Sequence, residues 1–158
     1  MQVRELNKQF DNAWLSVSWV QLGTLAIMQG QLDDARGLLN DGLTMSLDAE
    51  STQGVPLGLA AFARLALVEG TPDGAAVALG AAEGIRRRAG VRVWRHFRRG
   101  EAELVEQLKH SLGADRFENT FTAGSGLQPA RGSGHRSRRR QRRCRHLLSF
   151  SVGDSPPS

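Results

Sequence analysis

The sequence predicts an all-α protein, a short α-solenoid of helical hairpins followed by a disordered basic tail at the C-terminus. Two observations predict the hairpins: apolar residues recur at helical spacing, and the unit that begins at Trp19 recurs 40 residues later. A third observation predicts the tail, because Gly, Ser, Pro and Arg dominate from Ala123 onward. We therefore expect a helical domain over residues 1–124 and a tail over residues 125–158.

The first hairpin is predicted from one stripe of residues. Val3–Phe10 has the pattern of the second half of a preceding helix. Trp19, Leu22 and Ala26 then lie on one face of the next helix and should pack against its partner. Gly30 permits the left-handed backbone that ends this helix, and two aspartates favour the start of the next.

The second hairpin repeats this arrangement after a longer polar loop at residues 48–56. Thr71 is the expected N-cap of its second helix, with Pro72 at the first helical position. The residues that correspond to the first hairpin are Leu59, Phe62, Ala63, Ala66, Gly70, Ala75, Leu79 and Ala82. Two occurrences of one template are much harder to obtain by chance than a single occurrence.

Two further helices are predicted after Gly90, where the pattern weakens. Phe97–Leu112 places its leucines on one side and should end at Gly113. Ala114–Thr122 is the second of these helices and carries two phenylalanines at i and i+4.

Composition limits the classes of protein that this chain can be. Its 158 residues suffice for one domain. The single cysteine, Cys144, excludes an intramolecular disulfide framework and a cysteine-based zinc cage. No stretch approaches the roughly 18 apolar residues of a membrane span, and no small-residue cleavage pattern follows Ala13–Met28. We expect a cytoplasmic protein without membrane association.

The net charge of +5 describes the tail more than the fold. Residues 131–146 contain eight arginines and no acid, whereas residues 1–84 contain ten acids and four basic side chains. Residues 85–99 add seven further arginines without an acid. An acidic first half is expected to prefer a basic or polar partner segment.

The repeated unit resembles the tetratricopeptide repeat (TPR), a helix–turn–helix unit that stacks into solenoids. The matching positions are Trp19, Leu22, Gly23, Ala26, Ala35 and Leu39, with Ala26 in place of Tyr and Leu39 in place of Phe. The resemblance implies that the first helix of each pair faces a protein partner. It places candidate partner contacts at Gln21, Thr24 and Arg64.

A longer resemblance covers residues 3–124. The runs 62–76, 79–91 and 112–117 resemble the helical region of large ATP-binding LuxR-family bacterial transcriptional regulators. Those regulators also carry a P-loop ATPase and sometimes a C-terminal helix-turn-helix, and neither is recognisable in this chain. Its two lysines, Lys8 and Lys109, do not follow glycine, so a Walker A motif is absent.

These omissions indicate a non-catalytic interaction module that requires no cofactor. Our hypothesis is a truncated remnant or fragment of such a regulator, with the tail read from a shifted frame. The serines lack a nucleophile elbow, and the histidines have no metal-ligand spacing. Glu101, Glu103 and Glu106 are interpreted as a solvated helix face.

The alternative to an interaction module is a regulatory protein that binds nucleic acid without specificity. Clusters of arginine suggest it, because arginine neutralises phosphates. The tail residues concerned are Arg138, Arg139, Arg140, Arg142, Arg143 and Arg145. The simpler reading of this segment is a solvated tail without a selected role. For Arg86–Arg88 we expect a helix C-terminus that complements its dipole, followed by a solvated turn.

The N-terminal helix is also a candidate for self-association. Trp14 lies five residues before Trp19 and should face away from the repeat core, and Phe10 and Val17 should also be exposed. An exposed apolar patch of this kind favours a homodimer through the N-terminal helix. Trp94 is expected to pack against a neighbouring helix.

Overall fold

The computed structural model describes residues 2–128, with side chains from residue 11 onward, and these residues form six helices and no strand. The helices are α1 (Gln2–Met28), α2 (Leu32–Asp48), α3 (Gly54–Val68), α4 (Pro72–Ala89), α5 (Arg95–Leu112) and α6 (Ala114–Ser125). The all-α prediction is confirmed. The predicted tail, including its six candidate arginines, lies outside the described residues except for its first four positions.

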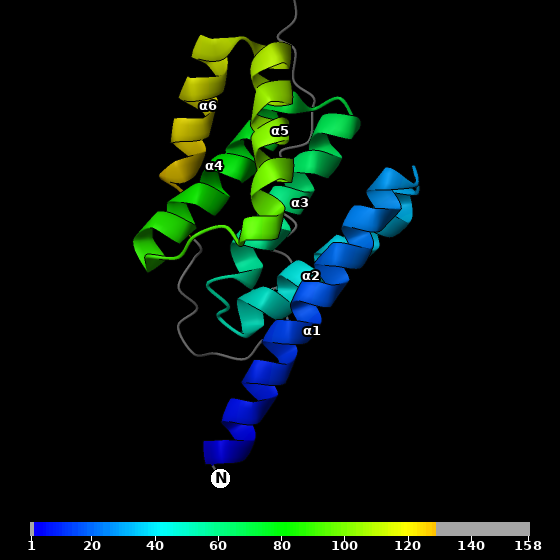
Figure 1. Cartoon of the computed structure of the whole chain (residues 1–158), viewed down its shortest axis with the longest axis vertical. Helices are drawn as coiled ribbons and strands as arrows, with labels where there is room; N and C mark the ends of the chain where they lie inside the picture. The colour runs from blue at the N-terminus through cyan, green and yellow to red at the C-terminus, as the bar shows by residue number, and fades with distance from the viewer. Residues whose placement is uncertain (1, 129–158) are drawn as a thin grey trace, which may run out of the picture. The chain divides into compact units, whose positions relative to one another are not determined.

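Two helical hairpins, α1–α2 and α3–α4, form the body of the fold (Figure 1). Their turns are set by Gly30 and Gly70, whose φ angles of 75° and 81° are left-handed, as the sequence predicted. Thr71 is the residue before α4 and Pro72 its first, as expected. The Thr71 hydroxyl, however, donates to the Ala66 carbonyl at 2.9 Å and does not cap α4.

The prediction for Val3–Phe10 is wrong, because this segment is the start of α1 and not the end of a preceding helix. Neither Gly nor Pro occurs between Gln2 and Leu22, so nothing in the sequence interrupts the helix. α1 is consequently 27 residues long, ten more than α2.

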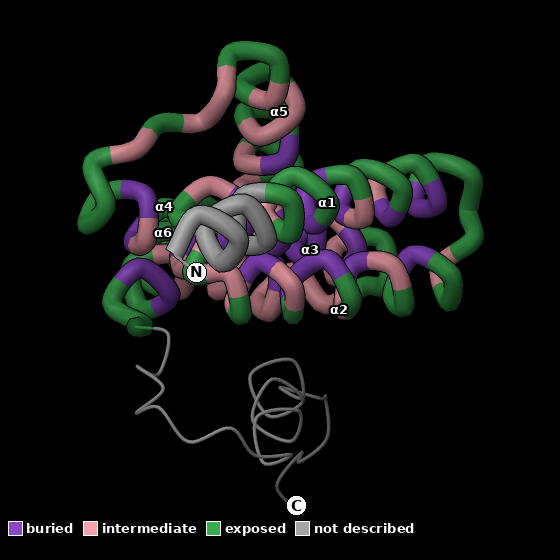
Figure 2. Tube along the Cα trace, turned by 90° about the horizontal axis from the view of Figure 1, so that it is seen from below, coloured by how far each residue is buried: buried purple, intermediate pink, exposed green. Residues whose placement is uncertain are grey.

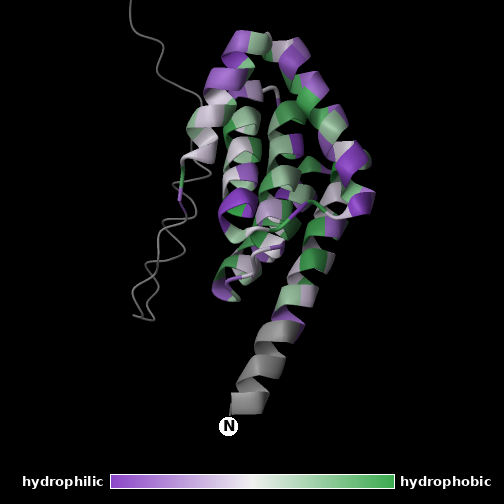
Figure 3. Ribbon diagram, turned by 60° about the vertical axis from the view of Figure 1, so that its left-hand side comes forward, coloured by the Kyte–Doolittle hydropathy of each residue, from purple (hydrophilic) through white to green (hydrophobic). Residues whose placement is uncertain are grey.

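The core consists of two apolar clusters. Figure 2 marks the buried residues along the helices in purple. The first cluster joins α1, α2 and α3 around Val20, Leu39 and Leu65. A Cβ on Gly23 would lie 2.6 Å from the Leu39 side chain, so α1 and α2 approach closely at this point. The second cluster joins α3 and α4 to α5 and α6. Figure 3 colours these helices by hydropathy and shows hydrophobic and hydrophilic residues alternating along them.

Three expectations for the α1 stripe are corrected. Leu22, predicted to pack on α2, is 51% exposed and belongs to neither core cluster. Val17 was expected to be exposed but is buried. Trp19 is only partly buried, while Ala26 is buried as predicted.

Glycines bring α6 against α4. A Cβ on Gly80 would lie 2.1 Å from the Phe121 carbonyl oxygen, and one on Gly84 would lie 2.2 Å from that of Ser125. On the opposite helix, a Cβ on Gly124 would lie 2.2 Å from the Val77 carbonyl oxygen. These backbones touch directly, which accounts for α6 running past the predicted end at Thr122 to Ser125.

α5 lies differently from the other helices. It projects from the layer that they form in Figure 2. It is held by Leu104 and Leu108, which are buried in the second cluster as predicted, and it starts at Arg95, two residues before the predicted Phe97. Gly113, with a φ of 80°, turns the chain from α5 into α6.

Candidate partner-binding groove

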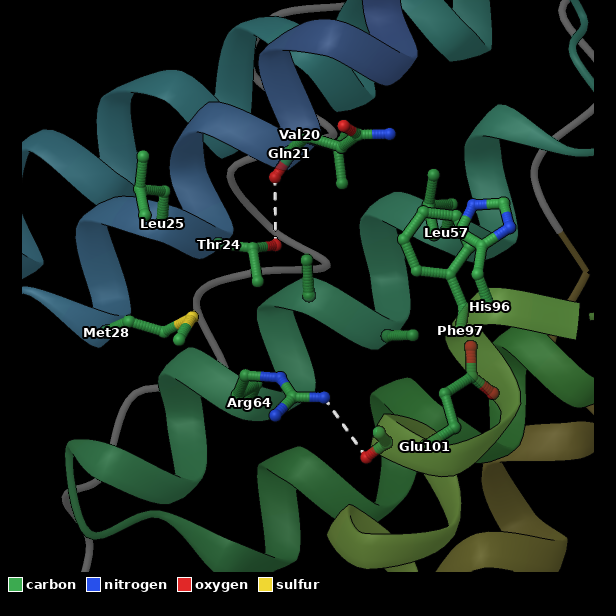
Figure 4. Close-up of a pocket in the computed structure, with 13 residues that line it drawn as sticks. Val20, Gln21, Thr24, Leu25, Met28, Leu57, Arg64, His96, Phe97 and Glu101 are labelled. Atoms are coloured by element: carbon green, nitrogen blue, oxygen red, sulfur yellow. Dashed lines mark hydrogen bonds between the residues drawn. The ribbon is translucent and has the colours of Figure 1, made fainter. Parts of the chain in front are cut away.

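A groove of about 470 Å³ opens between α1, α3 and α5. Each of these helices forms one side of the groove. α1 and α3 are the first helices of the two hairpins, and α5 forms the third side. The lining residues are Val20, Gln21, Thr24, Leu25, Met28, Leu57, Ala60, Ala61, Arg64, His96, Phe97, Gly100 and Glu101. Figure 4 shows Leu25 and Met28 at one end and Leu57, His96 and Phe97 at the other.

All three residues predicted from sequence as partner contacts lie in this groove. Gln21 and Thr24 come from α1, and Arg64 comes from α3 at the position that corresponds to Thr24 after the 40-residue shift. Equivalent faces of the two hairpins therefore meet at one surface. Partner binding by these residues stays a prediction.

The polar groups on the floor are largely satisfied within the protein. The Thr24 hydroxyl donates to the Val20 carbonyl at 2.9 Å. Arg64 Nη2 donates to the Gly100 carbonyl at 3.1 Å and so ties α3 to α5 (Figure 4). Because these groups have partners, the groove offers mainly apolar surface to a ligand.

Small residues create the space. Ala60 and Ala61, which are 5% and 6% exposed, form the bottom of the groove. Their short side chains leave space between the longer side chains of α1 and α5. Val20, at 1% exposed, completes the floor from α1. Larger side chains at the two alanines would fill the groove.

An aromatic cluster stands beside the α5 side of the groove. Trp94 stacks on Trp14 with ring centroids 6.2 Å apart and on Phe97 at 6.0 Å. His96 and Phe97 are 4.1 Å apart. Trp94 thus packs against a neighbouring helix, as expected, and that helix is α1. Sequence reasoning missed the groove contribution of His96 and Phe97, which no periodicity links to α1.

A buried ion pair lies beneath the α5 side. The two terminal guanidinium nitrogens of Arg86, Nη1 and Nη2, donate to the Glu101 carboxylate at 2.8 and 2.6 Å, and the two side chains are 6% and 14% exposed. Glu83 lies 3.9 Å from the same guanidinium. The expectation that Glu101 is solvated is therefore wrong. Glu103 and Glu106 are exposed, as expected.

The interpretation of Arg86–Arg88 as a helix end with a solvated turn is correct only in part. All three lie in the last turn of α4, where they complement its dipole. Arg86 is nevertheless buried, and Arg88 donates to the carbonyls of Ser125 and Leu127 at 3.0 and 2.8 Å. Arg87 and Arg88 are both exposed, as expected of the cluster, although Arg88 also has these two backbone partners.

Two other kinds of feature are absent from the part of the chain that the structure describes. Among these residues, no group of three or more His, Cys, Asp or Glu side chains is arranged to hold a metal ion. None of the described helices has the length and apolarity needed to cross a membrane. The tail arginines, Arg138 to Arg145, lie outside these residues.

The fold and groove define a unit of two helical hairpins with a third wall added by α5. Comparison of the chain with protein-family models, with curated proteins and with solved structures found no match.

Proposed function

We propose that the chain is a non-catalytic protein–protein interaction module whose α1–α3–α5 groove receives an apolar segment of a partner protein. The hairpins act as TPR-like repeats in this proposal, and the leading helix of each carries the contacts. The observation that carries it is the convergence of Gln21, Thr24 and Arg64 in one groove of about 470 Å³.

The lining favours a helical or extended peptide with apolar anchors. Leu25, Met28 and Phe97 present apolar side chains, while Gln21 and His96 offer hydrogen bonds at exposed positions. Grooves of this kind accept the apolar face of an amphipathic helix at i, i+3 and i+4 spacing. A cytoplasmic regulatory role, as a remnant of a LuxR-type ATPase regulator, is the biological setting that we propose.

Selection of peptides from a display library on the full-length chain tests the groove. We expect selected peptides to share apolar anchors, and Thr24→Arg to weaken their binding at least about tenfold by filling the groove. Thr44→Arg is the matched control, because Thr44 is exposed on α2 and does not line the groove. Peptides that bind both variants as well as the wild type would contradict the proposal.

Nucleic-acid binding through the tail is the second candidate, supported by eight arginines and no acid in residues 131–146. Deleting residues 129–158 should abolish salt-sensitive DNA binding if the tail carries it. Undiminished DNA binding by the remaining chain would instead place nucleic-acid recognition in the helical unit and reverse the ranking.

A further inference from the structure

A second surface, distinct from most of the groove, is left uncovered on α1. Five of the seven exposed large apolar side chains in the described part of the chain lie on this one helix: Trp14, Leu15, Leu22, Leu25 and Met28. Their exposed fractions run from 49% to 77%. We call these five residues the outer face of α1.

We propose that the outer face of α1 is a homodimer interface that pairs with the outer face of α1 in a second copy of this chain. The inference goes beyond the groove function, because Leu15 and Leu22 do not line the groove. Leu25 and Met28 belong to both surfaces.

The second hairpin supplies an internal control for this face. After the 40-residue shift, Leu15, Leu22 and Leu25 correspond to Val55, Phe62 and Leu65 of α3, which are 7%, 7% and 1% exposed. Those α3 residues belong to the cluster that packs on the first hairpin. The part of this face between Leu15 and Leu25 is therefore packed in the second hairpin and bare in the first, whereas Met28 corresponds to Val68, which is also exposed.

The charge pattern of α1 also indicates a covered surface. No charged residue occurs from Asn12 to Met28, a stretch of more than four helical turns. Solvent-exposed helices normally carry charged side chains on the outer side. Ser18, which lies among the apolar residues, donates its hydroxyl to the Trp14 carbonyl at 3.4 Å and so has a partner within the helix.

The exposed area is sufficient for a dimer. The exposed parts of five such side chains amount to roughly 500 Å² per copy, so a symmetric pair buries about 1,000 Å², the size at which specific interfaces begin. A two-fold arrangement places the same patch on both copies and closes the assembly. Trp14, held against Trp94 at 6.2 Å, would enter this interface already ordered.

Sedimentation equilibrium of the full-length chain tests the proposal. It is run under reducing conditions, because Cys144 could otherwise cross-link two copies. About 1 M salt shortens the Debye length to about 3 Å and suppresses association through the arginine-rich tail. We expect a dimer that persists in this salt, and a melting temperature that rises with chain concentration. A monomer at about 100 μM chain would overturn the proposal.

Substitutions on the outer face locate the interface. Leu22→Glu should raise the dimer dissociation constant at least about tenfold, and Leu22→Ala should raise it less while keeping a strong helix former. Val68→Glu is the matched control, because Val68 is 56% exposed on α3 and should leave dimerisation unchanged. Equal dimerisation of both Leu22 variants and the wild type would refute an α1 interface.

Failure of this proposal can be distinguished from failure of the groove. Leu22→Glu should leave peptide binding intact, since Leu22 is outside the groove, and Thr24→Arg should leave the dimer intact. Circular dichroism of each variant confirms that helix content is retained. If Leu22→Glu loses helix content, the Leu22→Ala dissociation constant decides: a value equal to that of the wild type refutes the interface.

Discussion

Trp14 of α1 and Trp94, the residue before α5, stack with ring centroids 6.2 Å apart and ring planes 29° apart. This contact joins the first helix to the segment that leads into the third wall of the groove. Trp94 extends it by stacking on Phe97, a groove residue. Trp94 therefore links Trp14, on the outer face of α1, to Phe97, which lines the groove.

The tryptophan contact should be measurable as a coupling energy. In a double-mutant cycle of Trp14→Leu and Trp94→Leu, we expect about 0.5–1.5 kcal/mol of coupling in the free energy of unfolding. Urea denaturation of the four proteins measures it. The same cycle with Phe121→Leu in place of Trp94→Leu should be additive, because Phe121 packs on the second cluster. Strict additivity for the tryptophan pair would show that the stacking contributes nothing.

The buried ion pair should tolerate loss of one partner poorly. Glu101→Gln leaves the buried Arg86 guanidinium with only the more exposed Glu83 carboxylate, 3.9 Å away, and we expect a loss of about 2–4 kcal/mol in the free energy of unfolding. Arg86→Met combined with Glu101→Leu should recover much of that loss, because it removes both charges. Chemical denaturation of the three variants checks the order.

An exposed pair on the same helix supplies the control for this prediction. Arg99 and Glu103 lie 3.0 Å apart, with side chains 91% and 57% exposed. Glu103→Gln should change the free energy of unfolding by less than about 0.5 kcal/mol. Similar losses for Glu101→Gln and Glu103→Gln would contradict a role for burial in the strength of the first pair.

The glycine contact between α4 and α6 should not accept a methyl group. Gly80→Ala would bring Cβ to 2.1 Å from the Phe121 carbonyl oxygen, so α6 must move, and we expect a loss of about 1–3 kcal/mol or more. Gly37→Ala is the matched control, because nothing lies within 4 Å of its Cβ position in α2. The control should be stabilised by about 0.5–1 kcal/mol. Thermal melts compare the two, and a stabilised Gly80→Ala would disprove the close approach.

Arg88 should hold the last turn of α6 in place. Arg88→Met removes the donors to the Ser125 and Leu127 carbonyls, and we expect about 0.5–1.5 kcal/mol of lost stability. Hydrogen exchange should accelerate at residues 124–127 before it does so in α4. Arg87→Met, at an exposed neighbour, should leave that exchange unchanged. Uniform acceleration in both variants would argue against a local role.

The hairpins could be predicted because their signals are local. Gly30 and Gly70 end their helices by backbone geometry that depends on one residue. Periodic small and apolar residues place Ala35 and Leu39 in the core, where both are fully buried. Gln21, Thr24 and Arg64 reach the groove because equivalent positions on two hairpins share one face.

The third wall could not be predicted, because its contacts join segments without a common period. Arg86 and Glu101 belong to different helices, and the sequence alone favours solvent for both. Leu22 shows the opposite error. Its counterpart in the second hairpin, Phe62, is buried against the first hairpin, whereas no described residue covers Leu22 itself. Local pattern therefore predicts which face is apolar, but not which neighbour covers it.

The attachment of α5 has a consequence for selectivity. The walls formed by α1 and α3 belong to tightly packed hairpins, and α6 is fixed by direct backbone contact with α4. α5 is joined to α6 by a single glycine and reaches α3 and α4 through Arg64, Arg86 and two buried leucines. A tilt of α5 about Gly113 would widen or narrow the groove, and it would strain the Arg86–Glu101 pair and the contacts of the two buried leucines rather than the packing of α1 on α2. If the groove binds a peptide as proposed, such a movement of α5 would let the same groove fit peptides of different width.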